Sequence, residues 1–293
     1  MTPVQQQVVF VTGASRGVGR GIAHAFGEAG ATVYVGGRTT VDGTAPSRLP
    51  GTITETARLV TEAGGTGVPL PLDVRDDAQI ETAIARIGAE QGRLDVLVNS
   101  AWGGYERFTD GSPVNPGPFW EQPLDLWDAM HRVGLRAHYV ASSFAAPMMV
   151  ARGTGLIITL SSFAGQVFVP PVAYGVAHAA IDRLAADMAV DLRDHGVVSV
   201  ALYPGLVLTE SVLANIQYFE HEQNRETPRF VGRAAAALAA DPDVMRLTGL
   251  PLVAAEVAAA YGVEDEEGHR PVSNRSAITG PPTPGFPDPF PRP

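Results

Sequence analysis

Short apolar segments alternate with amphipathic segments along most of the chain. The apolar segments are rich in Val, Ile and Leu and lack a regular polar alternation, which is typical of strands buried on both faces. The amphipathic segments repeat apolar residues at helical spacing, as Val18, Ile22 and Phe26 do in the first of them. The pattern predicts strands over 8–13, 31–37, 67–74, 94–101, 155–162 and 197–205. It predicts helices over 17–30, 52–65, 76–92, 124–150 and 173–196.

This alternation predicts parallel strands joined by right-handed helical crossovers. We therefore expect the α/β fold class with three layers: a doubly wound, Rossmann-type parallel sheet of about seven strands between two layers of helices. Ligands of such sheets bind beyond the carboxyl ends of the strands, so the segments that follow the strands are the first place to look for a site.

Three long segments interrupt the alternation, over 38–51, 102–123 and 209–228. Because long loops in a compact domain are usually functional, we expect 102–123 and 209–228 to be lid-like insertions that wall a substrate site. Aromatic residues of the first insertion would either line an apolar pocket or anchor the loop or a subunit contact: Trp102, Tyr105, Phe108, Phe119 and Trp120.

Length and composition favour one domain over 1–270. A chain of 293 residues, 45% of them hydrophobic, can bury one large core. Seven of the last thirteen residues are proline, so 271–293 is expected to be an extended or disordered tail.

Charge and residue types exclude several classes of partner and site. The net charge of −10, with no basic run, disfavours nucleic acid and anionic membranes. The absence of cysteine excludes disulfides and thiolate metal sites. No apolar run reaches the ~18 residues of a membrane span and no basic signal region precedes the first strand, so a cytoplasmic protein is expected. Asp128, His131 and His138 share a helical spacing, but nothing else converges on them and no metal site is expected.

The segment "TGASRGVG" places Gly13, Gly17 and Gly19 between the first predicted strand and the first predicted helix. Small residues there let backbone N–H groups and the helix N-terminus approach a pyrophosphate. The sequence therefore predicts a dinucleotide site at the start of the domain.

Further motifs follow in an order found in one protein family. They are the T-G-x-x-x-G-x-G spacing of 12–19, "NSA" at 99–101, "SS" at 161–162, Tyr174 at the start of a predicted helix, and "PG" at 204–205 with Thr209 beyond. Over about 8–209 the chain resembles the short-chain dehydrogenase/reductase family. Segments such as "RLDVLVNSA" and "LAADMAVDLRDHGV" are similar to its dehydrogenase/reductase member 1 branch.

The resemblance implies catalytic and binding residues, position by position. Tyr174 matches the tyrosine that exchanges a proton with the substrate oxygen. The serine that orients the carbonyl corresponds to Ser162 by its "SSFAG" context and to Ser161 by its distance from Tyr174; Ser162 is preferred. Cofactor contacts correspond to Gly13, Ser15, Arg16, Gly17, Val18, Gly19, Arg38, Asp73, Val74, Asn99, Ala101, Pro204, Gly205 and Thr209.

The resemblance also implies a nicotinamide cofactor, a small-molecule carbonyl or alcohol substrate, and a homodimer or homotetramer built on the helices over 124–150 and 173–194. Asp73 would meet the adenine and Asn99 would pack against the cofactor, although both residue types also serve turns. No carboxylate ends the second predicted strand, whereas Arg38 follows it and Arg16 lies in the glycine loop. Since arginine can bind a 2′-phosphate in a bidentate manner, NADP(H) is favoured over NAD(H).

His178 departs from the family pattern, which has lysine four residues after the tyrosine. A unit charge ~4 Å away at an effective dielectric of ~20 contributes about 4 kcal/mol, and a neutral imidazole would forfeit most of this help. Imidazole could still donate one hydrogen bond to a ribose hydroxyl. If His178 acts as a protonated activator, turnover should rise at mildly acidic pH.

Gly134 is a second departure, since it stands where the family usually has an asparagine that supports a proton relay. The main hypothesis is an NADP(H)-dependent oxidoreductase that interconverts a carbonyl and a secondary alcohol. One alternative is a nucleotide-binding protein that is weakly catalytic or regulatory because His178 replaces lysine. Another is a non-redox reaction with Tyr174 as acid/base, against which the glycine loop and Arg38 argue.

Overall fold

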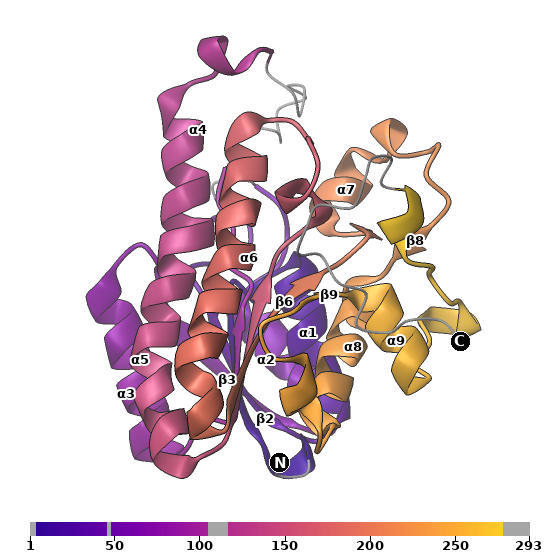
Figure 1. The fold of residues 1–293 in the computed structure, drawn as a ribbon. Helices are drawn as coiled ribbons and strands as arrows, with labels where there is room; N and C mark the ends of the chain where they lie inside the picture. The colour runs from indigo at the N-terminus through magenta and orange to yellow at the C-terminus, as the bar shows by residue number, and fades with distance from the viewer. Residues whose placement is uncertain (1–3, 46–47, 105–116, 278–293) are drawn as a thin grey trace.

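A computed structural model describes residues 4–45, 48–104 and 117–277 of the chain. Its central sheet has seven strands in the order β3-β2-β1-β4-β5-β6-β9, and every neighbouring pair is parallel (Figure 1). This confirms the predicted fold class. The strands are β1 (Val8–Thr12), β2 (Thr32–Gly37), β3 (Thr66–Pro71), β4 (Val96–Asn99), β5 (Gly155–Leu160), β6 (Val197–Tyr203) and β9 (Pro251–Val253).

Helices cover both faces of the sheet. The helices are α1 (Gly17–Glu28), α2 (Ile53–Glu62), α3 (Asp77–Gln91), α4 (Leu124–Ala129), the π-helix η4 (Met130–Arg136), α5 (Ala137–Arg152), α6 (Val172–Leu192), α7 (Glu210–Ala214), α8 (Pro228–Ala240) and α9 (Ala254–Tyr261). Alternate side chains of β1 point to opposite faces of the sheet. Val9 and Val11 pack with α1, α2 and α8, whereas Phe10 packs with α3 and α5. Buried apolar side chains on both faces explain why the strands are apolar throughout.

The predicted helix over 124–150 is confirmed, with one local change. α4, η4 and α5 follow one another without a break, and their middle portion winds as a π-helix. π-helical turns are rare and occur mostly at functional sites. The pattern of apolar positions carried no signal of it, because a π-turn shifts the helical register without adding a polar or glycine-rich interruption.

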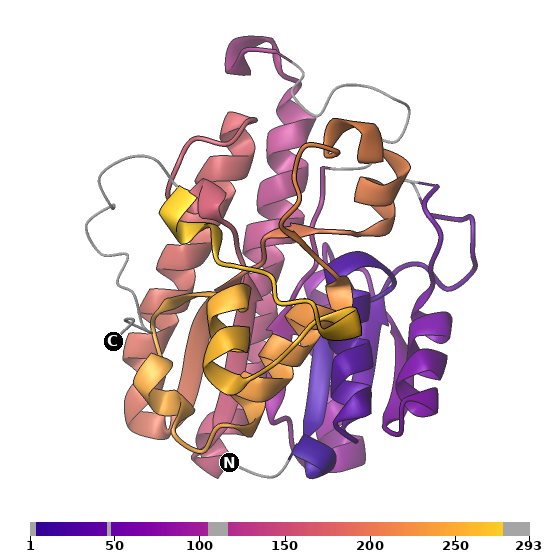
Figure 2. The same ribbon diagram turned by 90° about the vertical axis from the view of Figure 1, so that its right-hand side faces the viewer.

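The second insertion lies beyond the carboxyl ends of the strands. Its two ends pair as the short parallel strands β7 (Leu206–Val207) and β8 (Arg225–Glu226), with α7 between them. Figures 1 and 2 show this unit at the end of the molecule opposite the N-terminus, where β6 also ends. Because all strands of the sheet are parallel, the residues that follow them lie along this same edge.

Part of the expected tail contacts the rest of the protein. Ser273 and Arg275 bind the carboxylate of Glu256 at 2.7 and 2.8 Å, and Asn274 accepts a hydrogen bond from Asn224 at 2.8 Å. Residues 278–293 lie outside the described residues. Among the helices described, none has both the length and the hydropathy needed to cross a bilayer.

Candidate active site

The glycine loop joins β1 to α1, and its shape depends on missing side chains. Gly13 has a φ of +67°, and a Cβ there would lie 2.6 Å from Cα of Ala101. A Cβ on Gly19 would lie 2.5 Å from the carbonyl oxygen of Gly13. Larger residues would therefore displace the loop. Ser15 is buried and Val18 packs against the core.

The first turn of α1 binds an anionic oxygen. The backbone N–H of Gly17 donates to Oε2 of Glu210 at 2.7 Å, and Oε1 of Glu210 lies 3.7 Å from Nη1 of Arg20. Thr209 caps α7 by accepting from the N–H of Val212 at 3.3 Å. A donor that holds a carboxylate suits a pyrophosphate. Glu210 could not be predicted from the sequence, because a contact across 193 residues leaves no local pattern.

The two candidate cations lie beside the end of β2. The guanidinium of Arg16 donates to the carbonyl of Gly51 at 2.9 Å and to the hydroxyl of Thr39 at 3.3 Å, which ties it to the segment after β2. Arg38 follows β2 directly, is exposed, and its charge contributes to lowering the pKa of Asp73. The end of β2 therefore carries positive charge.

Asp73 and Asn99 follow or end neighbouring strands. Nη2 of Arg75 donates to Oδ2 of Asp73 at 2.5 Å, and this bond lowers the pKa of the Asp73 carboxyl. Val74 is buried beside α3. Asn99 is fully buried and donates to Oγ of Ser142 at 3.0 Å. The carboxyl of Asp73 and the amide nitrogen of Asn99 thus have local partners, whereas Oδ1 of Asn99 has no hydrogen-bond partner among the described residues.

Tyr174 and His178 lie one turn apart on α6, with ring centroids 4.3 Å apart. Trp102 completes a cluster of three rings: its indole stacks on the imidazole at 4.5 Å and 10°, and meets Tyr174 edge-on at 5.5 Å. His178 is 5% exposed, whereas Tyr174 remains partly exposed. The phenol is thus accessible to a ligand and the imidazole is buried.

Gly134 makes room for Trp102. A Cβ on Gly134 would lie 2.3 Å from Cζ3 of the indole. Gly134 lies in the π-helix η4, which packs against α6. An asparagine at this position would require the indole to move, so Gly134, Trp102 and His178 form one packing unit. In the sequence, Gly134 and His178 are two separate departures from the family pattern, and no spacing pairs Trp102 with either of them.

The two candidate serines have different environments. Ser161 is buried, and its Oγ donates to Oδ1 of Asp182 at 2.7 Å. Ser162 is partly exposed, and its Oγ accepts from the N–H of Ala164 at 3.1 Å as it caps η5 (Phe163–Gly165). The hydroxyl hydrogen of Ser161 is engaged inside the protein, whereas Ser162 uses only a lone pair in this contact.

His178 remains neutral over the ordinary pH range. Burial, and to a smaller extent the nearby His138, lower the pKa of its imidazole to about 3. This lowered pKa argues against the hypothesis that His178 acts as a protonated activator at mildly acidic pH. The reason is desolvation: the ring is enclosed by Trp102 and Tyr174, and this burial was not visible in the sequence.

The "PG" turn follows β6 and rests on a buried carboxyl. The N–H of Gly205, next to Pro204, donates to the carboxylate of Glu226, and a Cβ on Gly205 would lie 2.9 Å from Oε1. Glu226 is 1% exposed, and its Oε2 has no hydrogen-bond partner among the described residues. Burial raises the pKa of Glu226 to about 7. Sequence analysis missed this residue too.

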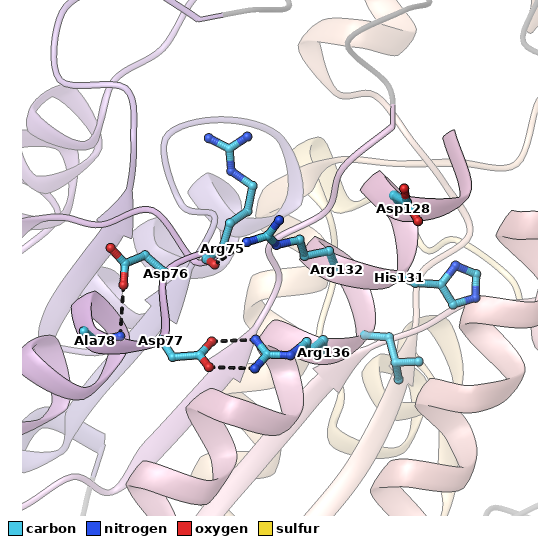
Figure 3. A pocket seen from close by; sticks show the side chains of 9 residues that line it. Arg75, Asp76, Asp77, Ala78, Asp128, His131, Arg132 and Arg136 are labelled. Atoms are coloured by element: carbon cyan, nitrogen blue, oxygen red, sulfur yellow. Dashed lines mark hydrogen bonds and ion pairs between the residues drawn. The ribbon is translucent and has the colours of Figure 1, made fainter. Parts of the chain in front are cut away.

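A polar groove of about 900 Å³ lies between α3 and η4 (Figure 3). The guanidinium of Arg136 binds both oxygens of Asp77 across it, at 2.5 and 2.6 Å. Gly134 is not among its lining residues, so the groove lies on another face of η4 from the ring cluster. His131 lines the groove, whereas His138 is buried and its Nε2 donates to the carbonyl of Ala101 at 2.9 Å. Among the described residues, no group of three His, Asp or Glu side chains could hold a metal ion.

An apolar pocket of about 450 Å³ lies between residues 117–122 and 168–172. Phe119 and Trp120 line it together with Phe168, and these three side chains are 62%, 73% and 78% exposed. Two of the predicted wall residues therefore meet at one pocket near the start of α6. Tyr105 and Phe108 lie outside the described residues.

The chain is similar to known proteins over most of its length. A family model described as short chain dehydrogenase matches residues 7–217. Dehydrogenase/reductase SDR family member 1 of Mus musculus is 39% identical over 287 residues, 94% of this chain and 87% of that one. A short chain dehydrogenase from Mycobacterium thermoresistibile superposes with a TM-score of 0.75 at 28% identity, covering 96% of this chain and 98% of that one. A 7α-hydroxysteroid dehydrogenase complexed with NADH and 7-oxo glycochenodeoxycholic acid shares the fold, with a TM-score of 0.70 at 22% identity and coverage of 91% and 96%.

Proposed function

The chain belongs to the short-chain dehydrogenase family, and from that premise we propose that it is an NADP(H)-dependent oxidoreductase that interconverts a carbonyl and a secondary alcohol. The family is one of oxidoreductases that bind nicotinamide cofactors and act on small molecules. The observation that carries the proposal is the ring cluster: a partly exposed Tyr174 lies on the sheet edge that also bears the glycine loop. A proton donor and a pyrophosphate site on one edge suit a reaction between a nucleotide and a small substrate.

The glycine loop fits the cofactor because Gly17 already holds a carboxylate oxygen and because Cβ atoms at Gly13 and Gly19 would close the approach. A bound nicotinamide supplies or accepts the hydride. We assign the pyrophosphate to this loop and the nicotinamide end to the side of Tyr174. The other cofactor-binding residues remain proposals: Ser15, Arg16, Val18, Arg38, Asp73, Val74, Asn99, Ala101, Pro204, Gly205 and Thr209.

Tyr174 is the proposed acid/base, which gives its proton to the substrate oxygen on reduction and takes it back on oxidation. Ser162 is the proposed carbonyl orienter. Its hydroxyl accepts from Ala164, which leaves its own hydrogen to donate, whereas Ser161 already donates to Asp182. His178, neutral and buried, is the proposed partner of the phenol in place of lysine.

Positive charge at the end of β2 supports NADP(H) over NAD(H). Arg38 is exposed there, and a guanidinium stabilises a 2′-phosphate by charge-assisted hydrogen bonds. Replacing Arg38 with Ala should weaken NADPH binding about tenfold or more and leave NADH binding unchanged. Arg58→Ala, which removes an exposed arginine on α2, is the matched control.

The test of the function combines binding with turnover. NADPH and NADH are titrated by fluorescence against the natural protein, Tyr174→Phe and His178→Lys, and each protein is then supplied with ketones, quinones and aldehydes. We expect NADPH to bind all three, the natural protein to turn over, and Tyr174→Phe to lose about a hundredfold or more in rate. Lack of NADPH binding to the natural protein would contradict the proposal.

A second candidate function is a nucleotide-binding, weakly catalytic or regulatory protein. The observation in its favour is that neutral His178 supplies no permanent charge beside Tyr174. Tight NADPH binding without turnover by the natural protein, together with turnover by His178→Lys, would select this function.

A further inference from the structure

Buried polar groups continue from His178 into the interface between α6 and the sheet. Oγ of Ser161 lies 3.4 Å from Nδ1 of His178 and 2.7 Å from Oδ1 of Asp182. Oδ2 of Asp182 accepts from the hydroxyl of Tyr203 and, at 3.1 Å, from Nε2 of Gln166. The proposed reaction uses none of these contacts beyond the imidazole itself.

The hydrogen positions follow from the donors available. Ser161 has one hydroxyl hydrogen, and the acceptor at 2.7 Å on Asp182 is closer than the carbonyl oxygen of His178 at 3.3 Å. An ionised Asp182 can only accept, so it takes this hydrogen. On the side of His178, Oγ of Ser161 then has only lone pairs. A hydrogen bond between Oγ and Nδ1 of His178 therefore requires the ring hydrogen on Nδ1.

The opposite ring nitrogen of His178 is consequently a bare acceptor. Nε2 is buried and has no hydrogen-bond partner among the described residues. The stack on Trp102 and the contact with Tyr174 fix the plane of the ring. A lysine at this position would be a donor only, so His178 reverses the direction of the hydrogen bond that the position can make.

A protonated Asp182 would reverse the whole chain. Its carboxyl hydrogen would be donated to Oγ of Ser161, and Ser161 would turn its own hydrogen toward Nδ1 of His178. The ring would then carry its hydrogen on Nε2. Each protonation state of Asp182 thus corresponds to one neutral tautomer of His178.

We propose that Asp182, Ser161 and His178 form a proton relay that serves the hydroxyl groups of the active site. The proposal deepens the proposed function, since it names the residues that restore the proton of Tyr174. It does not depend on that function for its structural test, because the tautomer of His178 is a property of the free protein.

The relay step balances without oxidant or reductant. After Tyr174 has given its proton to the substrate oxygen, Nε2 of His178 releases its hydrogen toward the phenolate, directly or through one intervening hydroxyl. Nδ1 takes the hydrogen of Ser161, and Ser161 takes the hydrogen of Asp182. Three hydrogens move by one place each, the negative charge passes from Tyr174 to Asp182, and no imidazolium forms.

The charges around the relay suit such a step. Burial raises the pKa of Asp182 to about 6, so both of its protonation states lie within reach near neutral pH. The pKa of His178 at about 3 disfavours an imidazolium between them. The titratable groups that face these two residues are Tyr174 on α6 itself, Tyr203 on β6 and His138 on α5. The pKa of Tyr203 is raised, and burial lowers the pKa of His138 to about 4. Neither changes charge near pH 6.

The relay replaces the two side chains of the family pattern that this chain lacks, the asparagine at position 134 and the lysine at position 178. Gly134 supplies no side chain on η4, and the space in front of it is filled by Trp102. A route through η4 is therefore blocked by an indole, whereas the route through Ser161 leads to Asp182, which is partly exposed to solvent. Protons can be exchanged with water at that end.

The test observes the ring nitrogens of His178 directly. The protein is labelled with ¹⁵N in its histidine rings, His178→Gln assigns the signal, and long-range ¹H–¹⁵N spectra are recorded from about pH 5 to about pH 8. We expect the hydrogen on Nδ1 at the upper end and on Nε2 at the lower end, with a change near pH 6 and no imidazolium.

Two aspartate variants on α6 separate the relay from general effects. In Asp182→Asn, Oδ2 is replaced by the amide oxygen that Tyr203 and Gln166 require, so the amide NH₂ faces Ser161 and should hold His178 in the Nε2–H tautomer at every pH. Asp187→Asn changes an exposed aspartate that pairs with Arg183 and should leave the pH-dependent change intact.

Activity provides the second readout. Asp182→Asn should lower kcat about tenfold or more and flatten its pH profile near pH 6, while the Kd for NADPH stays within about twofold. A single tautomer from pH 5 to 8 in the natural protein, or a change in Asp182→Asn that matches the natural protein, would overturn the relay. Failure to bind NADPH would instead overturn the proposed function and leave the tautomer result intact.

Discussion

His178 lies at the centre of the proposed active site, and its surroundings explain why position 178 does not hold an arginine. The chain contains no lysine: its 21 basic residues are all arginine. Position 178 is enclosed between Trp102 and Tyr174, where a flat imidazole stacks at 4.5 Å. A permanently charged guanidinium would be desolvated there, whereas a neutral imidazole is buried at little cost.

Replacing His178 with Lys should destabilise the protein by about 2–4 kcal/mol, because the stack on Trp102 is lost and an ammonium group is buried. Urea unfolding measures the effect. Arg183→Lys, at a position with a 79% exposed side chain on the same helix, is the matched control and should change the free energy of unfolding little. Because the new lysine is the only one in the variant, methylation with ¹³C-formaldehyde reports its pKa, which we expect below the usual ~10.4. An ordinary lysine pKa with unchanged stability would contradict the buried site.

Gly134 and Trp102 should behave as a coupled pair. A Cβ on Gly134 would lie 2.3 Å from the indole, so Gly134→Ala should cost about 1–3 kcal/mol of stability by overpacking. In a Trp102→Ala background the same change should be neutral or stabilising, since alanine favours helix over glycine by about 1 kcal/mol. Thermal unfolding of the four proteins gives the coupling energy. Equal effects in both backgrounds would show that Trp102 does not fill this space.

At the scale of elements, sequence patterns located strands and helices better than they located the contacts between them. The strands around β1 and the long helices were predicted because burial on both faces and helical spacing are local signals. β9, with three residues, and the π-helical register of η4 left no such signal. Glu210 reaches the glycine loop across 193 residues, and Glu226 contacts the "PG" turn from the end of the insertion that follows this turn, so no spacing rule could find either residue.

Glu210 connects the insertion to α1 and occupies the N–H group that we assign to the pyrophosphate. Cofactor binding must then displace this carboxylate, so Glu210→Ala should tighten NADPH binding by about tenfold, the value of one charge-assisted hydrogen bond. Isothermal titration measures the change, and Glu220→Ala, an exposed residue of the same insertion, is the control. Weaker binding in Glu210→Ala would show that the carboxylate assists the cofactor.

Glu226 makes the stability of this insertion depend on pH. Burial raises the pKa of its carboxyl in the folded state to about 7 from an unfolded value near 4.5. The folded state therefore binds the proton more tightly, and its stability falls as pH rises through this window. Glu226→Gln should be about 3 kcal/mol more stable than the natural protein at pH 8 and nearly equal to it at pH 4.5. Thermal unfolding at pH 8 and pH 4.5 measures this difference in stability, with Glu220→Gln as the control. An equal gain in stability at the two pH values would contradict a buried charge at Glu226.

For the whole molecule, the parallel sheet brings the sequence motifs to one edge. Each of these motifs follows a different strand: the glycine loop, Arg38, Asp73, Ser162 and the "PG" turn. A parallel sheet places the carboxyl ends of all its strands on the same side. The fold and the neighbourhood of the site were therefore predictable from the order of motifs. Burial was not: whether His178 is charged depends on Trp102, η4 and α6 together, and only the packed structure decides it.

A labelled hydride shows directly whether the protein transfers hydride from NADPH to a carbonyl carbon. NADPH carrying deuterium at C4 of the nicotinamide is incubated with the natural protein and the carbonyl panel, and the products are analysed by mass spectrometry. We expect an alcohol with one deuterium on the former carbonyl carbon, formed by the natural protein and not by Tyr174→Phe. Tight binding of NADPH with no deuterium in any product would contradict this expectation and leave a nucleotide-binding protein.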